Sequence, residues 1–506
     1  MAAVVSQLSV GQVLCSSSTK YTIIEFMGEG SFGKVAKCQI KSTCEIVAVK
    51  ILKVVQNVQD ELSMLSRIST LDPDHFNVVK FYEKFEYSGC TCLVFELLAM
   101  NLLQFLRTEL HFCSMYVHQI RPIAKQMLVA LQGLQSRWII HSDIKLDNVM
   151  LANHEETPYK VKLIDFGLAI PFSAARCGMQ LQAIGSRAPE ICLGLPFTEA
   201  IDMWGLGCML ADLYLDQSLF PVNCEYLMMK AMVEFLGMPP DYQLCCGVYT
   251  KKFFCQEEDE FGSRWRLLTP EEYSANNNKK AEEWPAWRCH FKSWDDLLYF
   301  FNEEDAEEFE DRRAFIDFLK QVLHQDGGKR ISPTEALQHP FITMSHLSQD
   351  PGSSDYLTEA QSCMSMKCTN EDIDEEHKVQ LSPSQVLLAN SWESDEVHGR
   401  EPFDQILTPA SSQIEPLSDV NNDNGSVKEP SLDWGEEFNH HSTVDDSGFF
   451  TLPHCGDENL ESVSSVNGPV EEDVPIPAPK RFRNVRKFFS RILKTFFGCF
   501  CCSVQE

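Results

Sequence analysis

The sequence predicts an α+β fold with two lobes, a β-rich first lobe and a helical second lobe, followed by a long disordered acidic tail. Runs rich in β-branched residues dominate about the first hundred positions, and helical hydrophobic spacing dominates from Val117. Beyond about residue 345 the periodicity fades into Asp, Glu, Ser, Pro and Asn, a composition that cannot offset its ordering entropy. We therefore predict a folded domain over residues 21–342, a tail over 343–479 and a basic segment over 480–506.

The first lobe is predicted from three short apolar segments. Tyr21–Met27 and Val47–Leu52 are rich in β-branched and apolar residues and flank a glycine-rich turn, and Thr91–Phe95 is a further run of this kind. Between them, apolar residues spaced four and then three positions apart predict a helix in residues 58–65. Glu61 lies beside the apolar face of that helix.

The second lobe is predicted to be mostly helical. Apolar residues from Ile120 to Leu134 follow a helical period and are typical of a buried helix, and Ile201–Tyr214 and Arg313–Leu323 have similar patterns. Residues 251–311 are polar and charged. We expect them to form a long insert before the last helices.

The charge is unevenly distributed along the chain of 506 residues, whose net charge is −30. Residues 350–479 hold 28 Asp and Glu against 4 Lys and Arg, a net charge of −24, whereas residues 480–506 hold 7 basic residues and one Glu, a net charge of +6. The remainder therefore carries −12. Because phosphate neutralisation needs a basic face, we expect no direct binding of nucleic acid.

The 20 cysteines form no recognisable metal-binding pattern, because the neighbouring pairs are too close for a CxxC knuckle and no second half follows. Met1–Val10 lacks the basic start and apolar run of a secretory signal. We therefore expect reduced thiols and a location in the nucleus or the cytoplasm. No stretch of about 18 apolar residues exists, so we expect no membrane span.

Five short motifs follow one another in a fixed order. Residues 28–35 read Gly-Glu-Gly-Ser-Phe-Gly-Lys-Val, and residues 47–50 read Val-Ala-Val-Lys. Residues 141–148 read His-Ser-Asp-Ile-Lys-Leu-Asp-Asn, residues 165–167 read Asp-Phe-Gly, and residues 188–190 read Ala-Pro-Glu. Each motif alone is a hypothesis, but five at these spacings indicate phosphoryl transfer.

The glycine-rich motif and the lysine strand are predicted to bind the nucleotide. Glycines let the backbone approach phosphates without a Cβ clash. Lys50 is then expected to hold the α- and β-phosphates and to pair with Glu61. Lys53 is the competing lysine, but it lies an odd number of residues away and would point to the opposite face of a strand.

The later motifs are predicted to carry the chemistry, which consists mainly of positioning groups and neutralising charge. Asp143 is expected to accept or orient the substrate hydroxyl proton, with Lys145 near the transferred phosphate. Asn148 and Asp165 are expected to bind Mg²⁺ through oxygen ligands, which suit a hard cation.

Three further residues are expected to be structural. Glu190 is predicted to form a buried ion pair with Arg330. Asp202 is predicted to accept hydrogen bonds from the backbone of the loop that contains Asp143.

Together these motifs resemble a protein kinase over about residues 21–342. Longer stretches resemble homeodomain-interacting protein kinases, which belong with the dual-specificity tyrosine-regulated branch. The stretches that carry this resemblance are Leu93–Glu96, His141–Asp143, Leu193–Trp204, Trp265–Leu267 and His339–Leu347.

The resemblance implies a kinase that uses ATP and Mg²⁺ to phosphorylate Ser and Thr of transcription regulators and signalling proteins. Phe95 would be the bulky residue at the back of the adenine pocket, and Glu96 and Leu98 would supply backbone contacts of the hinge. The candidate ATP-binding residues are Met27, Gly28, Glu29, Gly30, Ser31, Phe32, Gly33, Lys34, Val35, Lys50, Glu61, Glu96 and Leu98.

Two departures from the family concern the activation segment. Gln180 occupies the apparent position of a self-phosphorylated tyrosine, and residues 183–190 read Ala-Ile-Gly-Ser-Arg-Ala-Pro-Glu where relatives read Ser-Arg-Tyr-Tyr-Arg-Ala-Pro-Glu. With Ile184 in place of arginine, we expect a weaker preference for proline after the phosphorylated residue.

Ser142 replaces the usual catalytic-loop arginine, so no guanidinium is available there to bind a phosphorylated loop. We therefore expect activity that does not require activation-segment phosphotyrosine.

Two functions from different classes follow. The first is an active ATP-dependent Ser/Thr kinase, and the second is a kinase-like scaffold that binds regulators without phosphorylating them. The presence of Lys50, Asp143, Asn148 and Asp165 favours catalysis.

The basic segment predicts an amphipathic helix with apolar residues on one face and basic residues on the other. Such a helix can lie in a membrane interface, and the cysteines that follow it, Cys499, Cys501 and Cys502, are candidates for palmitoylation. A nuclear-localisation cluster in 480–487, a helix that docks on a partner, and a helix that folds onto the acidic tail are the alternatives. The apolar face consists of Val485, Phe488, Phe489, Ile492, Leu493, Phe496 and Phe497.

Overall fold

The computed structural model describes residues 8–29, 33–52, 58–153, 155–259, 262–283, 289–301, 305–347 and 354–365. The glycine-loop residues Gly30, Ser31 and Phe32 lie outside this described part, as do Lys53, the acidic tail beyond residue 365 and the basic segment with its three cysteines. No helix in the described ranges is long and apolar enough to cross a membrane.

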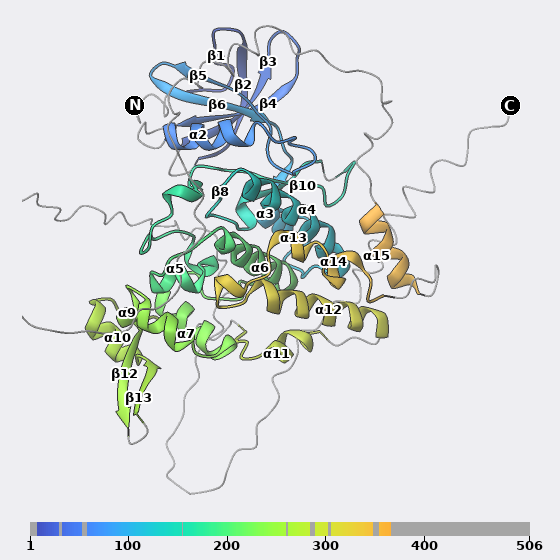
Figure 1. Ribbon diagram of the computed structural model, residues 1–506. Helices are drawn as coiled ribbons and strands as arrows, with labels where there is room; N and C mark the ends of the chain where they lie inside the picture. Colours follow the sequence, from blue (N-terminus) through green and yellow to red (C-terminus); the bar gives the residue numbers. More distant parts are fainter. Residues whose placement is uncertain are drawn as a thin grey trace, which may run out of the picture. The chain divides into compact units, whose positions relative to one another are not determined.

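The first lobe contains a six-stranded antiparallel sheet in the order β1-β2-β3-β4-β6-β5, accompanied by helix α2 (Figure 1). The predicted strands and helix form where composition and helical spacing placed them, but the sheet begins before residue 21, because β1 pairs with the start of β2. One face of the sheet buries a small core that includes Ile23, Val49 and Val94. The elements are β1 (Val13–Cys15), β2 (Lys20–Glu29), β3 (Gly33–Ile40), β4 (Ile46–Leu52), α2 (Val58–Ile68), β5 (Phe81–Tyr87) and β6 (Cys90–Glu96).

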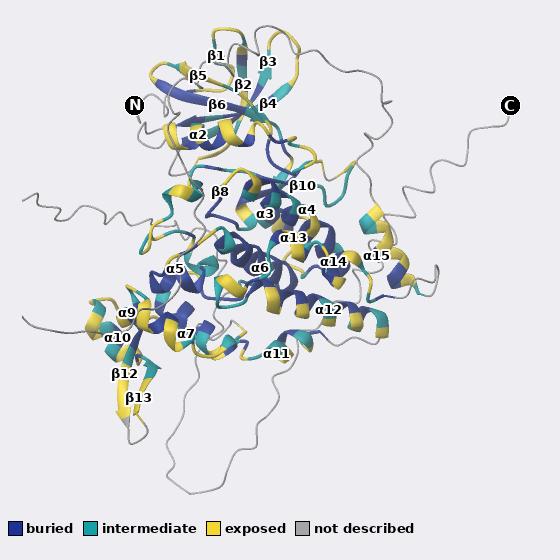
Figure 2. Cartoon of the chain, in the orientation of Figure 1, coloured by how far each residue is buried: buried dark blue, intermediate teal, exposed yellow. Residues whose placement is uncertain are grey.

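The second lobe is built around two helices, α4 (Val117–Ser136) and α6 (Ala200–Leu215), which pack against each other. Figure 2 shows that both are mostly buried, and α6 is apolar on nearly all sides, as a central helix must be. The catalytic loop and several short elements lie between these two helices in the sequence. Those elements are β8 (Ile139–Ile140), η1 (Leu146–Asn148), β9 (Val149–Leu151), β10 (Val161–Leu163), β11 (Ile170–Pro171), η2 (Phe172–Ala174), η3 (Ile184–Ser186) and α5 (Pro189–Leu193), whereas β7 (Met100–Asn101) and α3 (Leu102–Thr108) precede α4.

The predicted insert is more ordered than its composition suggests. The described part of residues 251–311 contains most of α9, a hairpin, the short helices α10 and α11, and the first turns of α12, which begins at Ala306 rather than at Arg313. Asp305 caps α12 by accepting from the backbone N–H groups of Glu307 and Glu308. The elements after α6 are α7 (Glu225–Leu236), α8 (Asp241–Cys246), α9 (Thr250–Phe253), β12 (Phe254–Asp259), β13 (Gly262–Leu267), α10 (Pro270–Asn277), α11 (Trp294–Leu298), α12 (Ala306–Val322), η4 (Gly327–Lys329), α13 (Pro333–Ala336) and α14 (Pro340–Thr343).

A helix also forms inside the stretch that we predicted to be a disordered tail. Helix α15 (Asp355–Ser365) packs against α4 and α12. The hydroxyl of Tyr356 donates to Asp311 Oδ2 at 2.5 Å, and Asp311 also accepts from Arg121 of α4. Leu357 and Ala360 are buried beside them. The prediction was wrong for these residues because composition cannot reveal a buried partner on another helix.

Candidate active site

Strands β3 and β4 bring the glycine-rich motif beside Lys50. Val35 is paired with Lys50 in the ladder, and Gly33 with Leu52. A Cβ at Gly33 would lie 2.1 Å from the carbonyl oxygen of Ile51, so this close approach of two backbones requires glycine. Gly28 and Glu29 end β2, and Lys34 pairs with Glu29 at 3.4 Å.

Lys50 of β4 forms ion pairs with carboxylates of both lobes. Its Nζ lies 2.7 Å from Glu61 Oε1 of α2 and 2.8 Å from Asp165 Oδ1 of the second lobe. Burial acts to lower the pKa of Lys50, but the carboxylates of Asp165 and Glu61 outweigh it and hold this pKa above its ordinary value. The ammonium therefore stays charged, as its predicted phosphate-binding role requires, and the predicted pair with Glu61 is confirmed.

The catalytic loop brings Asp143, Lys145 and Asn148 together. Asp143 is nearly buried, and its Oδ2 accepts from Asn148 Nδ2 at 2.7 Å and pairs with Lys145 Nζ at 3.0 Å. Asn148 Nδ2 also donates to the Asp143 carbonyl at 2.9 Å. These bonds fix which atom of the Asn148 amide points to Asp143, and they leave its oxygen for another ligand.

Asp202 of α6 binds the backbone of this loop. Its carboxylate accepts the backbone N–H groups of His141 at 2.7 Å and Ser142 at 2.8 Å, which confirms the predicted anchoring role. Burial raises the pKa of Asp202 to about 7, although the two N–H donors oppose the rise.

The Asp-Phe-Gly motif, residues 165–167, contacts Lys50 and the catalytic loop. Asp165 has a left-handed backbone with φ of 60°, and its Oδ1 accepts from Lys50 and from the Gly167 N–H at 3.3 Å. Burial acts to raise the pKa of Asp165, but Lys50 outweighs it and holds this pKa below its ordinary value. Phe166 is buried against the edge of the His141 ring, with centroids 5.0 Å apart.

The activation segment is held by bonds that the sequence did not reveal. Arg187 donates to the carbonyl of Gln182 at 3.0 Å and pairs with Glu225 of α7 at 2.6 Å. Gln182 has φ of 65° and a buried side chain, which donates to the Ile201 carbonyl at 2.9 Å and accepts from the Ala188 N–H at 3.0 Å. Spacing gave no signal for Gln182 or Glu225, because their partners are distant in sequence or belong to the backbone.

Two other glutamates that the sequence singled out, Glu190 and Glu96, can be located. Glu190 forms a bidentate pair with Arg330 at 2.7 and 3.0 Å, which confirms the buried ion pair. The carboxylate of Glu96 binds Lys162 at 2.7 Å, and its N–H donates to the Lys80 carbonyl at 3.0 Å. The hinge role that the resemblance gives Glu96 and the buried Leu98 rests on their backbone groups and stays a prediction.

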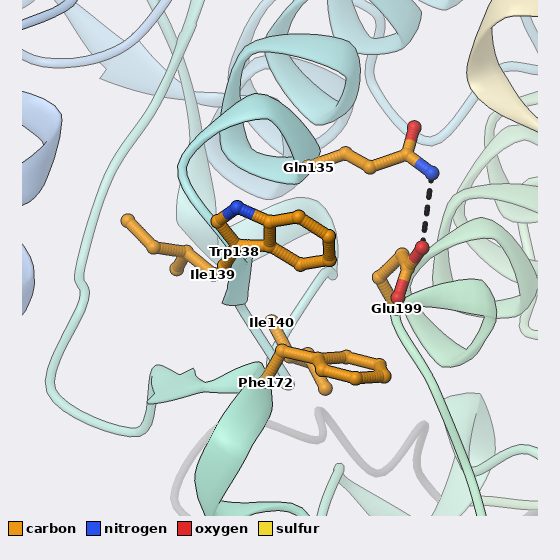
Figure 3. A pocket seen from close by; sticks show the side chains of 6 residues that line it. All are labelled: Gln135, Trp138, Ile139, Ile140, Phe172 and Glu199. Atoms are coloured by element: carbon orange, nitrogen blue, oxygen red, sulfur yellow. Dashed lines mark hydrogen bonds between the residues drawn. The ribbon is translucent and has the colours of Figure 1, made fainter. Parts of the chain in front are cut away.

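A small cavity lies beside β8, next to the catalytic loop (Figure 3). Its volume of about 10 Å³ suits at most one water molecule, so it is not a nucleotide site. Across it, Gln135 Nε2 donates to Glu199 Oε1 at 2.9 Å. The lining residues are Gln135, Trp138, Ile139, Ile140, Phe172 and Glu199.

Comparison with known proteins gives a consistent result. A family model described as protein kinase domain matches residues 21–342. Homeodomain-interacting protein kinase 2 of Mesocricetus auratus is 43% identical over 367 residues, which are 71% of this chain and 31% of the relative. Homeodomain-interacting protein kinase 1 of Caenorhabditis elegans is 40% identical over 67% of this chain and 42% of the relative, and homeodomain-interacting protein kinase 4 of Homo sapiens is 36% identical over 66% and 56%. The chain thus spans about a third of the length of the first of these relatives.

Proposed function

Because the chain belongs to the protein kinase family, we propose that it is an active kinase that transfers the γ-phosphate of ATP to serine and threonine hydroxyls of proteins. The observation that carries this proposal is the joint geometry of Lys50, Glu61, Asp165, Asp143 and Asn148. A scaffold that only bound regulators would have no need for this arrangement. The geometry therefore gives the scaffold alternative no support.

The residues would divide the work as follows. Lys50 binds the α- and β-phosphates, while Glu61 keeps its ammonium in place. Asp143 orients the attacking hydroxyl and accepts its proton, and Lys145 neutralises charge on the phosphate in transfer. Bound ATP supplies the phosphoryl group.

A protein kinase domain implies a divalent metal ion, which we propose is Mg²⁺. Asp165 and Asn148 each present a side-chain oxygen beyond those already bonded to Lys50 and Gly167, and oxygen donors fit a hard cation. Asp165 and Asn148 would hold the ion and would leave its other positions to phosphate oxygens and water.

The substrates are proposed to be transcription or signalling regulators. The support is the name of the relatives, which are called homeodomain-interacting protein kinases. We propose a nuclear or cytoplasmic location, and peripheral membrane attachment through residues 480–506 with acylation of Cys499, Cys501 and Cys502. A fluorescent protein fused to residues 480–506 tests the attachment. Membrane signal that is lost when the three cysteines become serine supports it, and purely nuclear signal in both versions contradicts it.

The test of the kinase activity is direct. Full-length chain is incubated with radiolabelled ATP, Mg²⁺ and a mixture of peptides, and the phosphorylated residue type is identified. We expect phosphoserine and phosphothreonine in the wild type and none above background in Lys50→Met. Absence of transfer to any peptide or protein substrate by well-folded wild type would refute the proposal.

A further inference from the structure

We propose that Ser142 is a positioning residue whose hydroxyl holds the metal-binding Asp-Phe-Gly segment against the catalytic loop. This inference rests on the proposed kinase function. It gives a specific role to a buried side chain of the catalytic loop. The ligand concerned is a metal–nucleotide complex bound through Asp165.

The first observation is the position of Ser142. It lies between His141 and Asp143, is fully buried, and has a left-handed backbone with φ of 61°. Its N–H donates to Asp202 Oδ1 at 2.8 Å, so the backbone of this residue is fixed by a buried carboxylate of α6. The side chain is therefore presented from a rigid support.

The second observation is the bond that the side chain makes. Ser142 Oγ donates to the carbonyl oxygen of Leu168 at 2.6 Å. Leu168 is the residue immediately after the Asp-Phe-Gly motif. Its side chain is 41% exposed, so packing of that side chain contributes little to holding the segment.

The third observation is that the bond has a counterpart on the other side of the motif. His141 Nε2 lies 3.0 Å from the carbonyl oxygen of Ile164, the residue immediately before Asp165. Two successive catalytic-loop side chains, His141 and Ser142, thus bind the two carbonyls that flank residues 165–167. Asp165, whose carboxylate is proposed to bind the metal, therefore lies between two carbonyl groups that are hydrogen-bonded to the catalytic loop.

The consequence concerns the metal rather than the fold. Asp165 needs a left-handed backbone, which for a residue other than glycine is held only by its surroundings. Loss of the Ser142 bond frees the chain on one side of Asp165, so the metal-competent arrangement becomes less populated. A single hydrogen bond of this kind changes such a population about fivefold.

The test compares two variants with a matched control. Ser142→Ala and Ser142→Gly both lose the hydroxyl, but glycine relieves the left-handed backbone whereas alanine does not. Ser136→Ala loses a bond of the same type, from Ser136 Oγ to the Gly133 carbonyl at 2.7 Å, at the end of α4. Full-length protein is titrated calorimetrically with a non-hydrolysable ATP analogue, once with Mg²⁺ and once with a chelator.

We expect both Ser142 variants to bind the analogue about fivefold more weakly with Mg²⁺ and unchanged with the chelator. The KM for ATP at saturating peptide should rise by a similar factor, while the KM for peptide stays constant. Ser136→Ala should match the wild type in both. Equal weakening with and without metal, a defect in the alanine variant alone, or no defect overturns the proposal. Because binding is measured without turnover, a wild type that transfers no phosphate would refute the proposed function and leave this test intact.

Discussion

Arg187 donates hydrogen bonds from both Nε and Nη2 to the carbonyl oxygen of Gln182, at 3.3 and 3.0 Å. Gln182 can turn this carbonyl toward Arg187 because its backbone is left-handed. The acceptor is therefore occupied within the chain. A substrate backbone N–H placed against the Gln182 carbonyl would find this acceptor already occupied, and an unsatisfied N–H is unfavourable when it loses water.

The bonds between Arg187 and Gln182 change our expectation about the preference for proline in the substrate. From Ile184 alone we expected a weakened preference for proline after the phosphorylated residue, but the occupied carbonyl favours a residue that has no N–H, which is proline. We now expect peptides with proline at that position to exceed alanine peptides at least about fivefold in kcat/KM. Ile184→Arg should change this ratio little. Equal rates for the two peptides in the wild type would contradict the structural argument.

Asp143→Asn should abolish most turnover and leave nucleotide binding intact. The amide cannot accept the hydroxyl proton, so kcat should fall at least about 10²-fold. Steady-state rates and binding of an ATP analogue measure the two effects. Asp295→Asn, an exposed aspartate at the start of α11, is the matched control and should behave as the wild type. A variant at position 143 that turns over normally would remove Asp143 from the mechanism.

Activity should not depend on tyrosine phosphorylation of the activation segment. Gln180 lies 3.4 Å from Arg187, and Glu225 neutralises the same guanidinium at 2.6 Å, so no phosphate is needed to hold it. Purified enzyme treated with a tyrosine phosphatase should retain its initial rate. A phosphotyrosine peptide dephosphorylated in the same reaction confirms that the phosphatase works. A large loss of rate would show that another tyrosine regulates the enzyme.

Gly185 and Val222 should be energetically coupled. A Cβ at Gly185 would lie 2.5 Å from Val222 Cγ1, so Gly185→Ala forces the valine to move. We expect Gly185→Ala to destabilise the protein, and to do so by at least about 0.5 kcal/mol less when Val222→Ala is also present. Chemical denaturation of the four proteins in this double-mutant cycle measures the coupling. Strictly additive effects would mean that the two side chains do not compete for this space.

Asp216 should make stability fall as the pH rises. Burial raises the pKa of Asp216 to about 6 from its ordinary value of 3.8, so the folded protein holds this proton more tightly than the unfolded chain. The contribution of the protonated Asp216 carboxyl group to the free energy of unfolding is fully present below pH 4 and is lost as the pH rises through 6. Asp216→Asn, which also tolerates the left-handed backbone at the end of α6, should raise the melting temperature at pH 8 and not at pH 4. Identical pH profiles for both proteins would contradict this assignment.

The sequence determined the parts that depend on local pattern and on motif. A run of β-branched and apolar residues predicted β4, and helical spacing of apolar residues predicted α4 and α6, each within a few residues of its observed bounds. The Asp-x-Lys-x-x-Asn run predicted Asp143, Lys145 and Asn148, because residues so close in sequence share one loop. The pairs of Lys50 with Glu61 and of Glu190 with Arg330 were also predicted, but through motifs rather than through spacing.

Tertiary structure decided the contacts that no motif encodes. The bond from Ser142 to Leu168, the contacts of Arg187 with Gln182 and Glu225, and the anchoring of Tyr356 at Asp311 join side chains to backbone groups or to distant helices. Every residue has a carbonyl oxygen, so a sequence does not reveal which one accepts a side-chain hydrogen bond. The polar composition around α15 predicted disorder, but in the structure α15 packs against α4 and α12. Local chemistry fixed which residues can act, whereas the packing of the lobes fixed which atoms they meet.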